Sequence, residues 1–250
     1  MIEGVLHHCT DMEIERQYVD SHGQSEVAFA FCKLLGFALL PRLKSIARQK
    51  LYLPDTDSRD SLKSLDAILT RPIDWELIAQ QYDEMVKFAT ALRERTAAPD
   101  AILRRFTRSN VKHPTYKALS ELGKVIKTMF LCDYLASEEL RREIHAGLNV
   151  VERWNGTNDF IFFGKGGEVA TNRLEDQEMA ALSLHLLQVS LVYINTLMLQ
   201  NVLGEASWRS QMTDRDMAAL TPLVHAHINP YGIFELDMSQ RLPLDFLTAA

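Results

Sequence analysis

Two acidic residues stand where a carboxylate could do chemistry. Asp20 follows a short apolar run in YVDSHGQSE, and the end of a strand fixes the backbone while the side chain projects from it. Glu152 lies in LNVVERWNG, where apolar Leu148, Val151 and Trp154 would anchor a helix and hold the glutamate at a cleft. Taken alone, each residue has an ordinary explanation, because a strand-terminal Asp often caps the next helix and a helical Glu usually faces water.

Other candidate motifs point less clearly to chemistry. His225 and His227 alternate in HAHIN without a third ligand, so a structural role is favoured over a metal site. DSHG contains the residue types of a hydrolase triad, but triad members meet across a fold and no nucleophile elbow is present. GKGG could cradle a phosphate, yet it lacks the spacing of a P-loop, and an ordinary turn is favoured.

The elements around Asp20 follow from local pattern. We expect a helix to end near His8, a strand over 13–19, and a helix that begins after Ser25 and ends at Gly36. Residues 38–43 could form a second short strand, with Pro41 confining it to an edge or a bulge. Asp20 would therefore lie between a strand and the helix that follows it.

Beyond this region the chain reads as mostly helical. Residues 54–72 are rich in Asp, Ser and Pro and mark a boundary. The pattern is then helical almost throughout, and 55–146 resembles an all-helical insertion. Residues 159–172, apolar and then Gly-rich, are expected to form a strand or an extended turn.

Composition excludes several classes of protein. The chain has 250 residues, 47% of them hydrophobic, a net charge of -6 and three widely spaced cysteines. It is therefore expected to be globular, without a disulfide framework or zinc site, and cytoplasmic. The acidic balance does not suggest a free-standing nucleic-acid binder. Two basic runs could nevertheless hold phosphates locally or simply be solvated helix faces: Lys33, Arg42, Lys44, Arg48 and Lys50 in the acid-free stretch 27–54, and Arg104, Arg105, Arg108, Lys112 and Lys117 in 101–120.

One stretch is long enough to cross a bilayer. Residues 179–203 contain no Asp, Glu, Lys or Arg. Polar side chains are scattered along it, which favours a helix buried within a protein over one that faces lipid. No membrane partner is therefore expected.

Several long motifs, in order along the chain, carry a family resemblance. They are YVDSHGQSEVAFAFCKLLGFALLPRLK, LTRPIDWELIAQQYDEMVK, NVVERWNGTNDFIFFGKGGEVATNRLEDQE, LSLHLLQ and HINPYGIFELDM. Together they resemble the transposases of replicative class II bacterial transposons, the Tn3 family, over nearly the whole chain.

The resemblance implies a DDE transposase, in which three carboxylates hold two divalent cations, Mg²⁺ or Mn²⁺, that activate the attack on a DNA phosphodiester. Asp20 matches the second carboxylate and Glu152 the third. The expected fold is mainly α with a small β component (α+β), an RNase H-like core that is incomplete here and is interrupted by an all-helical insertion. The expected segments are 1–54 (partial core), 55–146 (insertion) and 147–250 (return to the core with the glutamate helix).

The resemblance also suggests partners and contacts. Transposon-end DNA, target DNA and further transposase copies are the expected partners. His22, Arg153, Lys165 and Arg173 lie beside matched positions and become candidates for DNA contacts. Trp154 could stack on a base, although core packing is favoured.

The chain departs from the family pattern at its start. The family's first catalytic aspartate lies upstream on another strand, and Asp11 cannot replace it because it precedes Asp20 by only a few residues. We therefore expect a carboxy-terminal fragment that is inactive alone. The alternatives are a non-catalytic fragment that binds full-length transposase or DNA and modulates transposition, and a product that does not fold.

Overall fold

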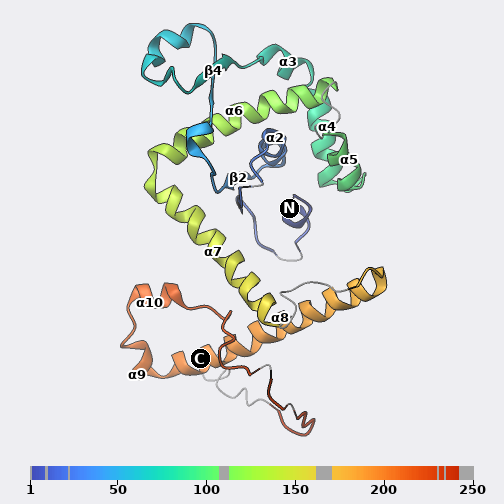
Figure 1. Cartoon of the computed structure of the whole chain (residues 1–250), viewed down its shortest axis with the longest axis vertical. Helices are drawn as coiled ribbons and strands as arrows, with labels where there is room; N and C mark the ends of the chain where they lie inside the picture. The colour runs from blue at the N-terminus through green and yellow to red at the C-terminus, as the bar shows by residue number, and fades with distance from the viewer. Residues whose placement is uncertain are drawn as a thin grey trace. The chain divides into compact units, whose positions relative to one another are not determined.

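The computed structural model describes residues 2–8, 11–21, 23–106, 113–161, 171–229, 231–233 and 235–241. They divide into two compact units, Met1–Leu148 and Asn149–Ala250, whose elements are drawn in Figure 1. The first unit contains α1 (Ile2–Leu6), β1 (Arg16–Val19), α2 (Glu26–Leu35), β2 (Ala38–Pro41), the 3-10 helix η1 (Ile46–Arg48), β3 (Leu51–Leu53), the 3-10 helix η2 (Asp57–Leu65), β4 (Leu69–Pro72), α3 (Trp75–Gln80), α4 (Tyr82–Arg93), α5 (Pro99–Arg105) and α6 (Pro114–Ala136). Helix α7 (Glu138–Ile161) begins in the first unit and ends in the second, which also contains α8 (Leu174–Gly204), α9 (Ala206–Arg209) and α10 (Asp214–Ala219).

A parallel strand–helix–strand unit forms around Asp20. Strands β1 and β2 pair in parallel from Arg16↔Ala38 to Val19↔Pro41, and α2 makes the crossover that parallel neighbours require. The Ser25 hydroxyl accepts a hydrogen bond from the backbone N–H of Ala28 and so caps α2. The helix ends at Gly36, whose φ of 95° is left-handed. The predicted order of strand, capped helix and strand is confirmed.

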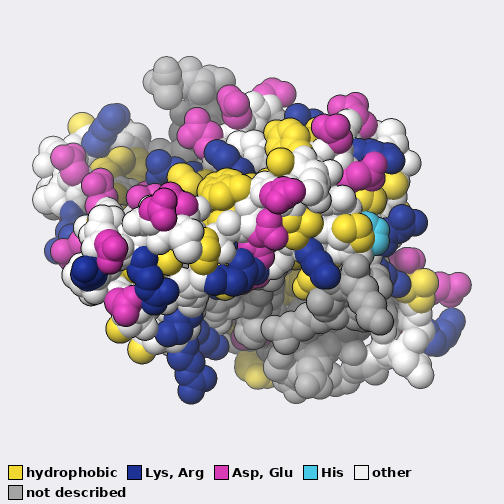
Figure 2. Space-filling model, turned by 90° about the horizontal axis from the view of Figure 1, so that it is seen from above, with side chains coloured by type: hydrophobic (Ala, Val, Ile, Leu, Met, Phe, Trp, Pro, Cys, Tyr) yellow, Lys and Arg dark blue, Asp and Glu magenta, His cyan; other side chains and the backbone are white. Residues whose placement is uncertain are grey.

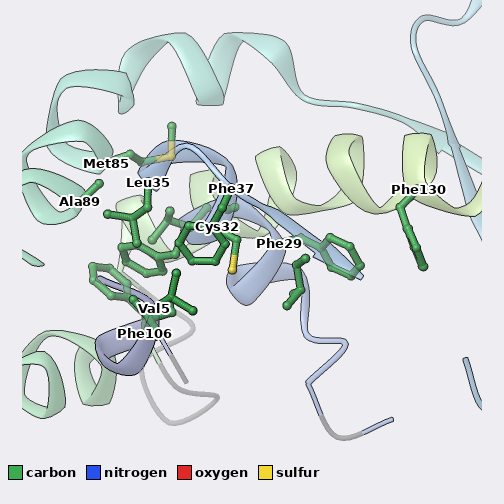
Figure 3. Packing of buried hydrophobic residues seen from close by; sticks show 14 of the residues in the cluster. Val5, Phe29, Cys32, Leu35, Phe37, Met85, Ala89, Phe106 and Phe130 are labelled. Atoms are coloured by element: carbon green, nitrogen blue, oxygen red, sulfur yellow. The ribbon is translucent and has the colours of Figure 1, made fainter. Parts of the chain in front are cut away.

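The core of the first unit surrounds α2. Figure 3 shows side chains of this cluster, which includes Val5, Phe29, Cys32, Leu35, Phe37, Met85, Ala89, Phe106 and Phe130. Helix α6 crosses α2 very closely, because a Cβ added to Gly123 would lie 1.8 Å from the carbonyl oxygen of Glu26. Two helices can approach this far only where one of them has no side chain.

A second parallel pair, β3 with β4, corrects the expectation of an all-helical segment over 55–146. Strand β4 lies within that range, and Leu69 pairs with Leu51 and packs with Leu53 and Leu131 in a small cluster. The sequence pattern does not reveal this strand, because it has only four residues, ends in Pro72 and depends on a partner outside the segment.

Helices α3 to α7, which follow β4, share the main hydrophobic cluster with α1, α2 and β2. An insertion in the sequence can still pack against the core that it interrupts. The division into 1–54, 55–146 and 147–250 therefore stays a prediction about ancestry, whereas contacts separate the chain after Leu148.

Helix α7 is longer than expected. Residues 159–161 continue it, although a strand or extended turn was predicted for 159–172. An apolar run such as DFI fits either conformation by pattern alone, and packing decides: Phe160 stacks on His225 with 4.5 Å between ring centroids, and Gln188 of α8 donates a hydrogen bond to Asn158. The GKGG motif falls outside the described residues.

Helix α8 is less buried than expected. By length and composition it could cross a membrane, but only 17% of its most apolar window is buried. Of its residues, Leu191, Asn195 and Leu197 are buried. The expectation that this uncharged helix lies inside the protein is therefore wrong for the described residues, because the few short elements of the second unit cannot cover 31 residues of helix.

Candidate functional site

Asp20 is the first residue after β1, and its side chain is exposed. Its carbonyl accepts a hydrogen bond from the backbone N–H of Gly23 over 3.2 Å, which turns the chain back toward α2. A Cβ added to Gly23 would lie 2.6 Å from Cγ2 of Val19, so the turn packs tightly on the strand that it follows. Strand and turn together fix the backbone of Asp20. His22, predicted to contact DNA, falls outside the described residues.

The turn after Asp20 is braced by the loop that follows β2. Gln24 Nε2 donates to the carbonyl of Ser21 over 2.6 Å. Gln49 Nε2 in turn contacts Gln24 Oε1 at 3.4 Å and the carbonyl of Lys44 at 3.2 Å. Because β1 and β2 are parallel, the turn and the loop leave the same edge of the sheet.

Helix α7 packs directly on β1. The Tyr18 hydroxyl donates a hydrogen bond to Glu143 Oε1 over 2.6 Å, and Arg16 forms an ion pair with the same oxygen at 2.5 Å. Gly147, one turn farther along α7, lies under the Tyr18 ring, because an added Cβ would be 2.7 Å from its Cγ and Cδ2 atoms. The strand that ends at Asp20 and the helix that carries Glu152 therefore meet at Tyr18.

The charges at this junction support each other. Hydrogen bonds from Tyr18 and then Arg16 lower the pKa of the Glu143 carboxyl. Burial and the neighbouring carboxylate raise the pKa of Tyr18, which keeps its hydroxyl proton available for donation. Sequence analysis did not single out Tyr18, Glu143 or Gly147. Gly147 alone carried a signal, since a glycine inside a helix costs about 1 kcal/mol relative to alanine and often has a packing reason.

Glu152 is exposed on α7, four residues after buried Leu148. Side chains separated by four residues lie on the same side of a helix, so Ile144, Leu148 and Glu152 follow one another along α7. Of the three expected anchors, Leu148 is buried and Trp154 half-buried, but Val151 is 51% exposed and does not anchor the helix.

The other predicted DNA contacts lie on α7 and near α8. Arg153 is exposed, and its carbonyl accepts a hydrogen bond from the Thr157 hydroxyl. Arg173 precedes α8 and forms exposed ion pairs with Glu175 at 3.5 Å and Asp176 at 3.7 Å. Lys165 falls outside the described residues.

Asp20 belongs to the first compact unit and Glu152 to the second. Within the described ranges, no three His, Cys, Asp or Glu side chains gather as a metal site would require.

Two cavities lie away from the predicted residues. One of about 860 Å³ in the first unit has Arg16, Lys33 and Glu143 in its wall. The other, of about 480 Å³ in the second unit, is lined mainly by apolar residues and by His227. The stacking of His225 on Phe160 agrees with the structural role that was favoured for these histidines.

A buried carboxylate organises the start of the helical region. Glu121 of α6 accepts hydrogen bonds from Arg71, from Lys124 at 2.7 Å and from the backbone N–H of Asp74 at 3.2 Å. Burial by itself would raise the pKa of Glu121, but these donors outweigh it and lower the pKa to about 2. The pair with Arg71 and Asp74 ties β4 and α3 to α6, which is a structural role.

Comparison with known proteins supports the resemblance seen in the motifs. Residues 1–234 match the family described as Tn3 transposase DDE domain. The chain is 30% identical over 247 residues to the transposase of transposon Tn1546 from Enterococcus faecium, covering 99% of this chain and 25% of that protein. It is 32% identical over 234 residues to the transposase of Tn3926 from Escherichia coli, covering 93% and 23%, and 30% identical over 243 residues to that of Tn501 from Pseudomonas aeruginosa, covering 97% and 24%.

This chain thus spans about a quarter of the length of the curated relatives that it matches. The match nevertheless covers nearly all of its own residues, including the strand that ends at Asp20 and the helix that carries Glu152. The chain belongs to the Tn3 transposase DDE domain family.

Proposed function

We propose that this chain supplies two catalytic carboxylates, Asp20 and Glu152, to metal-dependent DNA strand cleavage and strand transfer at transposon ends. The DNA of the transposon end and the target DNA would be its substrates. The chain would supply two of the three carboxylates that the family resemblance implies.

The observation that carries the proposal is the contact between β1 and α7. Arg16 and Tyr18 both reach Glu143, so the side chains at alternate positions of β1 face α7. Asp20 is the next position in that alternation, about 7 Å farther along the chain if it stays extended. Glu152 lies five residues past Gly147, about 7.5 Å farther along α7. Each carboxylate thus follows the contact between β1 and α7 within its own element, which supports the proposal that the two converge.

The donor chemistry fits a hard divalent cation. Mg²⁺ is usually held by one or two carboxylates and shares the rest of its shell with water and substrate phosphate. Asp20 and Glu152 are both exposed, which leaves room for those other ligands. When bound, Mg²⁺ or Mn²⁺ would supply charge that stabilises the attacking and leaving oxygens. The two side chains would hold the ions, and the complete site would contain two.

Arg153 and Arg173 remain proposed DNA contacts, together with His22 and Lys165. Arg173 would have to exchange its ion pairs with Glu175 and Asp176 for a phosphate, which is feasible because exposed pairs are worth at most about 1 kcal/mol. The matched relatives come from bacteria, and we place the protein in the bacterial cytoplasm, on the nucleoid when it holds DNA.

Divalent-ion binding tests the proposal directly. Mn²⁺ is titrated into the chain, and electron paramagnetic resonance measures the concentration of free ion. We expect Mn²⁺ to bind at one site, and we expect Asp20→Asn or Glu152→Gln each to weaken this binding by about tenfold or more. If both side chains hold one ion, the double variant should be little weaker than either single variant. Exposed carboxylates supply matched controls in each unit, Asp83→Asn and Glu178→Gln.

Two outcomes would refute the shared site. One is unchanged Mn²⁺ affinity in both single variants. The other is a small loss of Mn²⁺ affinity in each single variant, with a loss in the double variant equal to their sum in free energy. In a strand-transfer assay on a transposon-end duplex with Mg²⁺, any product that the chain gives should disappear in Asp20→Asn and in Glu152→Gln.

A second candidate function is binding to full-length transposase, or self-association, which modulates transposition. Exposed apolar side chains on α8 support it: Leu182 and Leu186 are 68% and 66% exposed. Co-purification with a full-length relative tests this candidate. It should weaken in Leu182→Ser/Leu186→Ser, and transposition unaffected by co-expression of the chain would count against it.

A further inference from the structure

A loop rich in Lys and Arg leaves the sheet at the same end as Asp20. After β2 the chain runs through residues 42–50, which carry Arg42, Lys44, Arg48 and Lys50 and no acid. Strands β1 and β2 are parallel and in register to their last residues, Val19↔Pro41. The residues that follow them, Asp20 and Arg42, therefore leave the sheet side by side, and the Arg42 N–H donates to the Val19 carbonyl over 2.8 Å.

The loop has a defined shape. The backbone N–H of Arg48 donates to the Ser45 carbonyl over 2.8 Å, and that of Gln49 to the Ile46 carbonyl over 3.0 Å. Gln49 also reaches Gln24, in the turn that follows Asp20. The cations are thus presented by a backbone tied to the carboxylate's own turn, so they need little ordering when a ligand binds.

The charges of this loop face solvent. Lys44, Arg48 and Lys50 are all exposed, and Lys50 Nζ donates to the Ala67 carbonyl over 3.3 Å. On the face of the molecule that Figure 2 shows, Lys and Arg side chains lie among Asp and Glu. The acid-free stretch around this loop begins after Glu26 and ends before Asp55.

We propose that the loop 42–50 holds the sugar–phosphate backbone of the DNA strand whose phosphate is presented to Asp20. This inference rests on the proposed function and chooses between the two roles that the sequence left open for this basic run, phosphate binding and a solvated face. A polyanion is the partner that suits several exposed cations on a short ordered loop. Because the contacts go to phosphates, the loop would position the strand without reading its sequence.

Salt-dependent DNA binding tests the assignment. The chain is titrated onto a labelled duplex of mixed sequence in EDTA, so that bound metal does not contribute, and anisotropy gives Kd over a range of NaCl concentrations. We expect Lys44→Gln/Arg48→Gln/Lys50→Gln to weaken binding at least about tenfold at low salt. The slope of log K against log salt should become shallower by about 2 to 3, because up to three phosphate contacts are lost.

A matched control variant removes three other exposed cations of the same unit, each of which forms an ion pair with an acidic side chain. Lys63, Lys87 and Arg142 pair with Asp60, Glu84 and Glu138. Their replacement by Gln changes the net charge by the same amount as the loop variant, and it should change the salt slope little. Equal effects of the two triple variants would show general electrostatics and overturn the assignment, as would absence of DNA binding by the wild-type chain at low salt.

Two further measurements distinguish an effect of the loop on DNA binding from an effect on folding or on metal binding. If the triple variant has no cooperative melt, Lys44→Gln/Arg48→Gln is used, because it keeps the bond from Lys50 to Ala67, and it should still weaken binding. Asp20→Asn should weaken Mn²⁺ binding by about tenfold or more and leave DNA binding in EDTA unchanged or stronger. If Asp20→Asn leaves Mn²⁺ affinity unchanged while the loop variant still weakens DNA binding, the proposed function is refuted. If the loop variant leaves DNA binding unchanged while Asp20→Asn still weakens Mn²⁺ binding, only this inference is refuted.

Discussion

Replacing Gly147 by Ala tests whether α7 lies directly on the strand that ends at Asp20. The new Cβ would be 2.7 Å from Cγ and Cδ2 of the Tyr18 ring and 3.1 Å from Cε2, closer than ordinary contacts of 3.4–4 Å. The ring cannot move away freely, because its hydroxyl is bound to Glu143. Such overpacking costs about 1–3 kcal/mol, while Ala gains about 1 kcal/mol over Gly in a helix interior. We expect a net loss of up to about 2 kcal/mol.

The assay is urea unfolding followed by circular dichroism, with the m-value checked for each variant. Gly156 is the matched control on the same helix, because nothing lies within 4 Å of a Cβ there. Gly156→Ala should therefore raise stability by up to about 1 kcal/mol. Both glycines lie inside α7, but only Gly147 faces β1. A loss of stability in Gly147→Ala together with a gain in Gly156→Ala would therefore report the contact with β1.

A double-mutant cycle isolates the ring. In a Tyr18→Ala background the space under the ring is empty, and Gly147→Ala should then become stabilising by about 1 kcal/mol. If Gly147→Ala is as stabilising as Gly156→Ala while Tyr18 is present, α7 does not lie on β1 as described. The support for convergence of Asp20 with Glu152 would then be lost as well.

Three further outcomes follow from other contacts. Glu121→Gln should lose up to about 3 kcal/mol at neutral pH, and its stability should change less with pH than that of the wild type. Because the pKa of Glu121 is lowered in the folded state, its contribution to stability is fully present above about pH 4.5 and is lost as the pH falls toward 2. The measurement is urea unfolding at a series of pH values, and equal pH profiles for the variant and the wild type would contradict this role. Gly123→Ala should cost more than about 3 kcal/mol or prevent folding, because its Cβ meets the Glu26 carbonyl, which is backbone and cannot turn aside; a melt near the wild-type temperature would be the contrary result. Tyr18→Phe removes the first of the hydrogen bonds that lower the pKa of Glu143, so that pKa should rise in a carbon-detected NMR titration, and an unchanged value would show that Arg16 alone sets it.

The strand–helix–strand unit at Asp20 was predictable because its signals are local. Ser25 caps the helix through its own hydroxyl, Gly36 ends it in a left-handed conformation, and the apolar runs on either side read as strands. The same holds for the family assignment, which depends on long motifs in order along the chain.

Other elements could not be predicted because they depend on distant partners. Strand β4 forms where Leu69 finds Leu51, and α7 continues through Ile161, where Phe160 packs on His225. Neither partner is visible in the local pattern. The stretch 179–203 of α8 has no charged side chain and predicted burial, but burial also requires enough neighbouring structure to cover the helix.

For the candidate site, the sequence by itself determined that Asp20 follows a strand and that Glu152 lies on a helix, together with the family in which such residues act. Only the tertiary structure showed that Tyr18, Glu143 and Gly147 hold that strand against that helix, and that the basic loop 42–50 shares the strand's edge. The physical reason is range. Caps, turns and periodicity act between residues a few positions apart, whereas a hydrogen bond between positions 18 and 143 exists only once the chain has folded.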